Sequence, residues 1–302
     1  MTGPRPTGTE FALVAAVVSG FAVFTNGLAI QRFDDATVYT TAKNLIAGAV
    51  VLAALVVHRR TAMGPDAGLP PGAVPRLAVV AVVGGAVPFV LFFEGLARAT
   101  STNAAFIHKT LVIWVALGAW AVLRERVTAM HVGAIALLVA GQTIVTGRPP
   151  TSGGTGELMI LGATLLWALE VLVVKRLLPT VPAHAAAAAR MAGGAVLLVV
   201  WLGVRGGLSE LVTLAPRQWA WLLLTGSTLS IFVLTWYTAL SLAPAVDVTS
   251  ILVLGAVITG LLNTGFRGVP LTIDSTGYVL LAAGAAAIVW TGRNRPLATL
   301  SA

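Results

Sequence analysis

Residues 129–178 read AMHVGAIALLVAGQTIVT, then GRPPTSGGT, then GELMILGATLLWALEVLVVKRLL: two apolar runs on either side of a run of turn-forming residues. Each apolar run has about the length of a helix that crosses the hydrocarbon core of a bilayer, which takes about 20 residues. The stretch between them, Gly147 to Gly156, is rich in Gly, Pro, Ser and Thr, which favour turns. This part of the sequence therefore predicts two transmembrane helices joined by a short linker at the midpoint of the chain.

The rest of the chain has the same character. Of its 302 residues, 57% are apolar and only 10% are charged, and the mean hydropathy is +0.92. Soluble domains carry about a quarter of charged residues, so a water-soluble fold is excluded. We predict an all-α membrane protein, because a helix satisfies its own backbone polar groups in lipid. The chain has no cysteine, which excludes disulfides and thiolate metal sites.

Runs bounded by charged residues, Gly or Pro predict ten spans. They are Glu10–Ile30, Ala36–Val57, Arg76–Leu96, Ser101–Leu123, Ala129–Thr146, Gly156–Leu178, Ala183–Val204, Arg217–Leu240, Ala245–Phe266 and Ser275–Trp290. The linker divides the spans into five and five, so we assign residues 1–147 to a first five-helix repeat and 156–302 to a second. An N-terminus in the cytoplasm places ten Lys and Arg in cytoplasmic segments and six in outer ones. This bias favours a multi-pass protein of the cell inner (plasma) membrane with both termini cytoplasmic.

The two halves resemble each other. Moving residues Phe92–Thr146 forward by 144 positions superposes them on Trp236–Trp290, span on span and without a gap. A shift of 147 places Lys43 on Arg190, so a cation recurs at the same depth of the second helix in each half. Because five is an odd number, the second copy enters the membrane from the opposite side. Such inverted repeats are common in secondary transporters, which hold the substrate near the midplane of the bilayer.

A local motif adds a family resemblance. Trp120 and the sequence LRERVT at 123–128 close the fourth span, and glycines from Gly133 to Gly141 lie in the fifth. With the ten spans, this pattern resembles the EamA-type branch of the drug/metabolite transporter superfamily. The resemblance implies export or exchange of small metabolites such as amino acids, through a cavity between the repeats that opens to each side in turn. The chain departs from the family pattern in having no proline in the fourth span of either repeat, and Arg267-Gly-Val-Pro270 where the first copy has Glu125.

Among the charged residues within predicted spans, we single out five: Lys43, Glu94, Lys109, Glu170 and Arg190. A charge at the bilayer centre costs roughly 2.5 to 3.5 kcal/mol on insertion scales, so these side chains must face the bundle interior, water or one another. We expect Glu170 to pair with Arg190 on a neighbouring helix. The pair is either a fixed salt bridge that sets packing or a coupling or gating element.

The two lysines have no comparably deep carboxylate in the first half, because Glu94 can pair with Arg98 four residues later. An anionic group such as a substrate carboxylate is then the natural partner of Lys43 and Lys109. Two alternatives remain for Lys43. It can extend past Tyr39 to the lipid headgroups, or it can bond helix carbonyls.

Other candidates for substrate contact are His108, Trp114, Trp167, Trp236 and Tyr237, whereas interhelical packing or an interfacial belt is the alternative for Trp120, Trp219, Trp221 and Trp290. His108 points about 100° away from Lys109 on the helix, so one can face the cavity while the other packs between helices. Glycines and the run of alanines are assigned to close helix packing. We list the remaining assignments together: Gly84-Gly85, Gly193-Gly194 and Ala185–Ala189 as packing surfaces, Asp247 as a helix-terminus acid, and His58, His131 and His184 as interfacial residues.

These features favour a secondary active transporter working by alternating access, with an amino acid or organic anion as substrate. A membrane-embedded enzyme using His108 and Glu94 is the first alternative, but the chain lacks a nucleophile and base grouping with recognisable spacing. A passive channel is the second, and buried opposite charges in inverted halves favour a closable site over it. We expect no cofactor, no metal and no nucleic acid. The expected partners are a small-molecule substrate and the lipid bilayer, with a homodimer left open.

Overall fold

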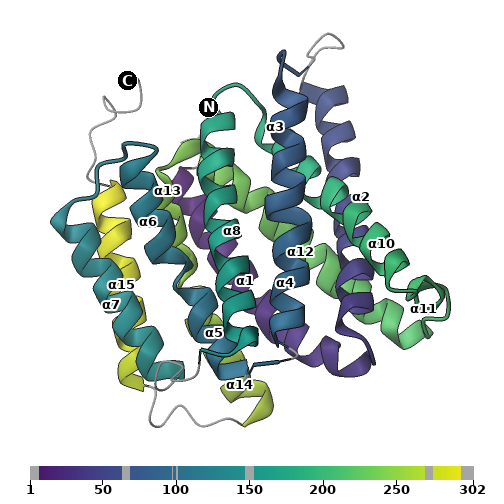
Figure 1. Ribbon diagram of the computed structural model, residues 1–302. Coiled ribbons are helices and arrows are strands. Elements are labelled where there is room, and N and C mark those ends of the chain that lie inside the picture. The colour runs from purple at the N-terminus through teal and green to yellow at the C-terminus, as the bar shows by residue number, and fades with distance from the viewer. Residues whose placement is uncertain are drawn as a thin grey trace.

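The computed structural model describes residues 7–62, 69–96, 98–99, 101–146, 153–268 and 275–293, which form a bundle of helices (Figure 1). Within these ranges no strand occurs. The helices are α1 (Gly8–Ala29), η1 (Ile30–Arg32), α2 (Ala36–Ala62), α3 (Ala73–Val80), η2 (Ala81–Ala86), α4 (Val87–Leu96), α5 (Ser101–Lys109), α6 (Leu111–Ala121), α7 (Ala129–Thr146), α8 (Thr155–Leu177), α9 (Ala183–Ala188), η3 (Ala189–Gly193), α10 (Gly194–Val204), α11 (Leu208–Val212), α12 (Pro216–Leu242), α13 (Ala245–Leu252), α14 (Gly255–Arg267) and α15 (Ser275–Arg293). Most of the predicted linker, at 147–152, and the loop at 269–274 with Pro270 lie outside the described residues.

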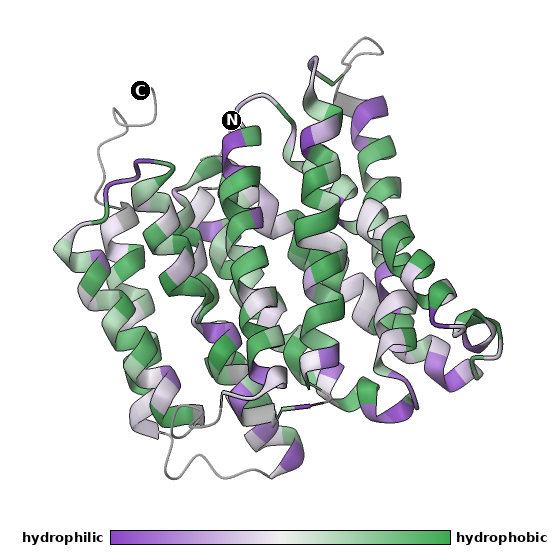
Figure 2. Ribbon diagram, in the orientation of Figure 1, coloured by the Kyte–Doolittle hydropathy of each residue, from purple (hydrophilic) through white to green (hydrophobic). Residues whose placement is uncertain are grey.

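Several of these helices, some of them joined end to end, form segments long and apolar enough to cross a membrane. Seven qualify by length and hydropathy: Gly8–Arg32, Ala36–Arg60, Ala73–Leu96, Thr155–Leu177, Ala183–Val204, Pro216–Leu242 and Ala245–Arg267. Three more apolar helices are shorter: Phe106–Ala121, Ala129–Val145 and Ser275–Thr291. Hydrophobic residues dominate the bodies of the helices, and many of the hydrophilic ones lie toward their ends (Figure 2). The prediction of an all-helical, multi-pass membrane protein is confirmed, and the count of ten crossings stays a prediction.

The first helices of the two halves, α1 and α8, run in opposite directions. Gly8 at the start of α1 packs against Ala243. The carbonyl of Ala243 accepts a hydrogen bond of 2.6 Å from Lys175 at the end of α8. The start of α1 therefore lies near the end of α8. The described part of α15 ends on the face of the bundle where α1 begins (Figure 1).

Glycines allow the helices to approach closely across the halves. In α7, a Cβ at Gly141 would lie 2.6 Å from the carbonyl oxygen of Gly277 in α15. The π-helical segment η2 crosses the junction of η3 and α10 at Gly85 and Gly194, where a Cβ on either residue would overlap backbone atoms of the other helix. Small residues at such crossings let backbones pack directly against one another in membranes. The predicted use of Gly84-Gly85 and Gly193-Gly194 for close helix packing is confirmed, whereas the contact at Gly141 and Gly277 was not predicted.

The fourth predicted span of each half is made of two helices. In the first half α5 ends at Lys109 and α6 begins at Leu111, and in the second α13 ends at Leu252 and α14 begins at Gly255. The turn residue Thr110 and its counterpart Leu254 are 144 positions apart, which is the shift that relates the halves. The two breaks therefore occupy the same place in the repeat.

Neither break contains a proline, and the hydroxyl of Thr110 accounts for the first. Its hydroxyl donates a hydrogen bond of 2.6 Å to the carbonyl of Ile107. The backbone N–H of Thr110 donates a second hydrogen bond, of 3.1 Å, to the same carbonyl. These bonds span three residues, and a side-chain bond of this kind competes with the helical ladder. The indole N–H of Trp114 donates a hydrogen bond of 3.0 Å to the hydroxyl of Thr110 and holds that hydroxyl in place. In the second half, Val253 N–H likewise bonds a carbonyl three residues back, at 3.2 Å.

Candidate functional site

A buried charged cluster lies in the second half, around Glu170 of α8. Glu170 is 2% exposed and Arg190 of η3 is 7% exposed, and Arg190 Nε lies 3.7 Å from Glu170 Oε1. The hydroxyl of Tyr237, on α12, donates to the same carboxylate oxygen. The predicted Glu170–Arg190 pair is therefore confirmed, and Tyr237 joins it. Removing one charge of such a pair would leave the other buried and uncompensated.

Gly84 of η2 brings the first half into contact with this cluster. Its carbonyl accepts hydrogen bonds from Trp167 Nε1 at 3.1 Å and from Arg190 Nε at 3.4 Å. A Cβ at Gly84 would lie 2.5 Å from Glu170 Cγ, so a larger residue would displace the carboxylate. The position of the charge cluster thus depends on a glycine in the other half of the chain.

Aromatic rings extend from the cluster toward the first helix break. The centroid of the Trp167 ring lies 5.0 Å from that of His108, 5.6 Å from Phe92 and 5.5 Å from Phe89. His108 thus packs among rings between helices, while its neighbour Lys109 lines a cavity. This division matches the prediction from their 100° separation. His108 Nδ1 is buried and has no hydrogen-bond partner among the described residues.

Lys43 lies in α2 and is 5% exposed. Its Nζ donates a hydrogen bond of 3.1 Å to Asn26 Oδ1 of α1. The same oxygen also accepts a hydrogen bond from the hydroxyl of Tyr39. The ammonium lies 4.9 Å from the centroid of the Tyr39 ring and 6.0 Å from that of Phe93. No ion pair found among the described residues includes Lys43. Its burial excludes the alternative in which this side chain reaches the headgroups.

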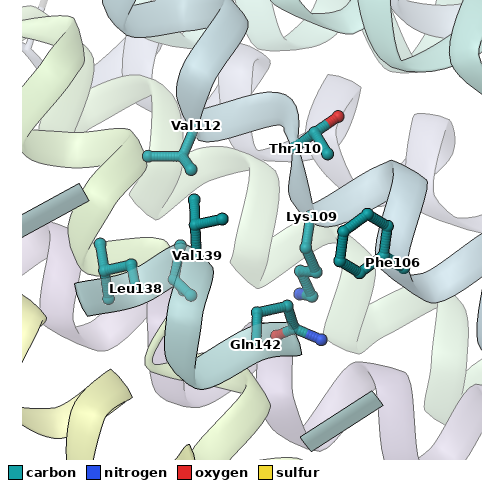
Figure 3. Close-up of a pocket in the computed structure, with 8 residues that line it drawn as sticks. Phe106, Lys109, Thr110, Val112, Leu138, Val139 and Gln142 are labelled. Carbon is teal, nitrogen blue, oxygen red and sulfur yellow. The ribbon is translucent and has the colours of Figure 1, made fainter. Parts of the chain in front are cut away.

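Lys109 lines a narrow cavity at the first helix break, and its side chain extends toward Gln142 of α7 (Figure 3). The cavity volume of about 10 Å³ is room for about one water molecule. Val253, at the break of the second half, lines the same cavity. The two breaks therefore meet between the halves. Lys109, like Lys43, has no carboxylate at ion-pair distance in the part of the chain that the structure describes.

Glu94 belongs to a separate network at one end of the bundle. Its carboxylate pairs with Arg98 at 2.7 Å, as predicted, and with Arg205 of the second half at 2.6 Å. Arg205 also donates a hydrogen bond of 3.0 Å to Thr37 Oγ1 of α2. Glu94 therefore connects α4 with α2 and α10 rather than joining the Glu170 cluster.

The remaining predicted aromatics pack against their own helices. Trp114 bonds Thr110, as described, and Trp236 is 3% exposed and stacks on Phe232 with 6.0 Å between ring centroids. Substrate contact by these two residues stays a prediction.

A polar network that the sequence does not predict lies at the start of α13. The carboxylate of Glu125 accepts hydrogen bonds from the N–H groups of Ala245 at 2.8 Å and Val246 at 3.2 Å. His131 Nε2 lies 2.9 Å from Asp247 Oδ1. His131, the third residue of α7, is 0% exposed, so it stands near a helix end as expected but is buried in protein, and Asp247 stands in the first turn of its helix. The loop that follows α6 thus holds the start of a second-half helix.

Apart from Lys43, a run of polar residues in α2 is also absent from the residues predicted as a site. All eight residues from Thr37 to Asn44 are buried, and six of them are polar. The signal is visible in the sequence, because such a run is unusual inside an otherwise apolar span. Thr40, Thr41 and Asn44 each have a buried side-chain oxygen without a partner among the described residues.

The fold and the site together define a class: a helical, multi-pass membrane protein with charged residues buried between two halves of the chain. Charged residues in such positions are typical of transport pathways. The family model of the EamA-like transporter family matches residues 7–147 and matches again at 154–291. The two matches span nearly all of the sequence. The chain belongs to the EamA-like transporter family, and the family resemblance expected from the sequence is confirmed.

The comparison with solved structures agrees on the fold. A crystal structure of a protein that is 18% identical superposes with a TM-score of 0.76, over 95% of this chain and 99% of the other. At this identity the likeness concerns the fold alone. A search of curated proteins finds no match.

Proposed function

We propose that the protein is a secondary active transporter that exports or exchanges a small carboxylate-bearing metabolite, such as an amino acid or organic anion. In this proposal the chain crosses the plasma membrane ten times as two inverted five-helix repeats, residues 1–147 and 156–302. Both termini are cytoplasmic, and access to the substrate alternates between the two faces. Membership of a transporter family and the opposite directions of α1 and α8 support this arrangement.

The observation that carries the proposal is the pair of helix breaks. Lys109 and Val253 stand at equivalent places of the two halves and line one cavity. In transporters built from inverted repeats, interrupted helices at corresponding positions surround the substrate near the bilayer midplane. A break also frees backbone groups that a continuous helix would use, and these can bond a polar solute.

The unpaired cations of the first half favour an anionic substrate. Lys43 and Lys109 have no carboxylate partner among the described residues, whereas Arg190 has Glu170. A substrate carboxylate would compensate the unpaired cations while it is bound. The Glu170–Arg190–Tyr237 cluster, which contacts Gly84 of the other half, is then placed to couple binding to movement.

Two polar networks fit the role of gates. At one end Glu94 of the first half binds Arg205 of the second. At the other, Glu125 of the first half binds the first turn of α13 in the second. Each connects the two halves, so each must open when its face of the transporter opens.

Counterflow into proteoliposomes tests the proposal. Vesicles preloaded with unlabelled amino acids, organic acids or nucleobases should take up the matching labelled solute, and uptake should saturate. Lys109→Met should raise the half-saturating concentration of anionic solutes about tenfold, because loss of an ion pair in a low-dielectric site commonly exceeds 1 kcal/mol. Arg267→Gln, which removes an exposed cation at the end of α14, is the matched control. Unsaturable flux would instead identify a channel, and chemical conversion an enzyme.

The orientation can be tested separately because the natural chain has no cysteine. A single cysteine at Thr7 or at Gly153 is the only thiol in each variant. In intact cells, a membrane-impermeant maleimide should react at position 153 and not at position 7. The reverse pattern would show that the termini are outside.

A further inference from the structure

The polar run of α2 is the feature of the structure that the packing explains least. Helices in a membrane place polar side chains toward the bundle interior and use them for function. Thr37 to Asn44 is such a surface: every residue in it is buried, although the run includes a lysine, an asparagine and three threonines. Its interior position removes the side chains from lipid, but it does not give all of them a partner.

Three oxygens on this surface are unpaired within the described part of the chain: Thr40 Oγ1, Thr41 Oγ1 and Asn44 Oδ1. Several other buried threonines bond the carbonyl one turn back, although Thr249 and Ser250 of α13 also have unpaired hydroxyls among the described residues. Thr164 bonds Ile160 O at 2.8 Å and Thr228 bonds Leu224 O at 2.7 Å. Because nearly all buried polar atoms in proteins have partners, three unpaired ones within five residues indicate a surface that binds something.

The charge at this surface is unbalanced in the same way. The ammonium of Lys43 has three N–H donors, and the one hydrogen bond found for it goes to Asn26. The equivalent cation of the second half, Arg190, has Glu170 as its counter-ion. A shift of 147 places Thr40, Thr41 and Asn44 on Ala187, Ala188 and Met191, which are apolar. The equivalent surface of the second half therefore lacks these polar side chains.

We propose that Lys43, Thr40, Thr41 and Asn44 form the recognition subsite for a carboxylate that also carries a hydroxyl or ammonium group. The Lys43 ammonium binds the carboxylate. Asn44 Oδ1 can only accept, so it requires an O–H or N–H donor from the solute. This inference rests on the proposed transport function and narrows its substrate to hydroxy- and aminocarboxylates.

The unpaired oxygens also predict what the subsite rejects. A site that is built to hydrogen-bond a substrate group discriminates strongly against an analogue without that group, because its own buried polar atoms then stay unpaired. Unsubstituted carboxylates should bind more weakly than their hydroxy or amino derivatives. Uncharged polyols should bind more weakly still, because they leave the Lys43 ammonium without a counter-ion.

A matched panel tests this order on the purified protein in detergent or nanodiscs. The three-carbon probes are lactate, alanine, propionate and 1,2-propanediol, and the six-carbon probes are gluconate, norleucine, hexanoate and sorbitol. Binding is measured by the shift of the unfolding temperature with probe concentration. At one chain length at least, the hydroxy or amino acid should bind about tenfold more tightly than the unsubstituted acid, and the alcohol should bind least. Equal binding of all four classes at both lengths, or binding of none, overturns the proposal.

Three variants locate the effect. Lys43→Met should weaken every carboxylate about tenfold, yet the ligand-free protein should unfold at the same or a higher temperature, since an uncompensated buried cation is removed. A purely structural lysine would give a lower unfolding temperature instead. Asn44→Leu should lose most of the preference for hydroxy and amino acids over the unsubstituted acid. Thr41→Val should reduce that preference, whereas Thr164→Val, the matched control with a satisfied hydroxyl, should not change it.

The subsite can fail while the transport function stands. Saturable counterflow of apolar or cationic solutes that Lys43→Met does not alter would reject the subsite alone. Absence of saturable counterflow for every solute tested would reject the transport proposal, and the subsite with it. Binding of hydroxy acids that survives in both Lys43→Met and Asn44→Leu would place the binding site elsewhere in the molecule.

Discussion

Replacing Glu125 with Gln should open the face of the transporter on which α13 begins. Glu125 belongs to the first half. Its carboxylate accepts hydrogen bonds from the N–H groups of Ala245 and Val246, which belong to the second half. If access alternates by movement of one half against the other, these bonds exist only while this face is closed. Weakening them therefore favours the state in which the face is open.

The size of the effect follows from the two hydrogen bonds. An acceptor that caps the first turn of a helix contributes about 0.5 to 2 kcal/mol, and its negative charge at the positive end of the helix adds about 0.3 to 1 kcal/mol. Gln keeps one acceptor oxygen and loses the charge. We expect the closed state to lose about 1 to 2 kcal/mol, which is a change of about 5- to 30-fold in the ratio of open to closed molecules.

Thiol labelling reports this ratio. Ser250 lies in α13 one turn beyond Asp247 and is 0% exposed, so a cysteine there reacts only when the surrounding helices separate. Because the chain has no other cysteine, the labelling rate of Ser250→Cys measures this opening directly. Adding Glu125→Gln should raise the rate about 5- to 30-fold when the maleimide reaches this face.

Glu210→Gln is the matched control, since it removes an exposed acid in α11, far along the chain from the gate. It should leave the labelling rate of Ser250→Cys unchanged. An equal rate for Glu125→Gln and the control, in protein that unfolds at the normal temperature, would refute the assignment of Glu125 to a gate. A rate that rises together with a loss of thermal stability would indicate local unfolding instead.

Three further changes test other parts of the structure. Glu170→Gln alone or Arg190→Met alone should lower the free energy of unfolding by about 3 to 5 kcal/mol. The double variant should recover most of this lost stability, as measured by thermal or denaturant unfolding. Normal transport by the double variant would show that the pair only sets packing. Gly85→Ala should destabilise the protein by about 1 to 3 kcal/mol, because a Cβ there overlaps η3, whereas Gly133→Ala, with open space around it, should leave the unfolding temperature unchanged. Thr110→Val should cost about 1 kcal/mol through the two hydrogen bonds of its hydroxyl, and the fluorescence of Trp114 should change as its indole loses a partner; an unaltered spectrum would count against the hydroxyl as the cause of the break.

Much of the helical arrangement could be predicted, because the bilayer fixes the length of an apolar span. The predicted span Ala36–Val57 and α2 begin at the same residue, since Asp34 and Asp35 stop the apolar run before it. The Glu170–Arg190 pair could be predicted for a related reason. Two opposite charges at similar depth in neighbouring spans have few partners other than each other.

The break at Thr110 could not be predicted, although the sequence around it was known. A threonine inside a helix commonly bonds the carbonyl four residues back and the helix continues, as at Thr164. Thr110 bonds the carbonyl three residues back instead, with an indole from the next turn on its hydroxyl. The choice between the two geometries depends on packing around the side chain, which a pattern of residue types does not contain.

The contact between His131 and Asp247 is unpredictable for a different reason. The two residues are separated by 116 positions, and each stands near a predicted span end where a polar residue normally needs no protein partner. Their pairing depends on how the first half is seated against the second. Local sequence can place each residue at a helix end, but only the assembled bundle decides that the histidine is buried.

The two halves share a fold and differ in charge, and this difference bears on how an anion would move. Equivalent positions hold Lys43 and Arg190, and likewise Lys109 and Val253. In the second half the cation has Glu170 and the break carries a valine, whereas both first-half lysines lack a described carboxylate. Alternating access with inverted repeats exchanges the conformations of the halves, but each half keeps its own side chains. A carboxylate held by either first-half lysine would therefore stay with the first half throughout the cycle, while movement of the second half would decide which side of the membrane it can leave from.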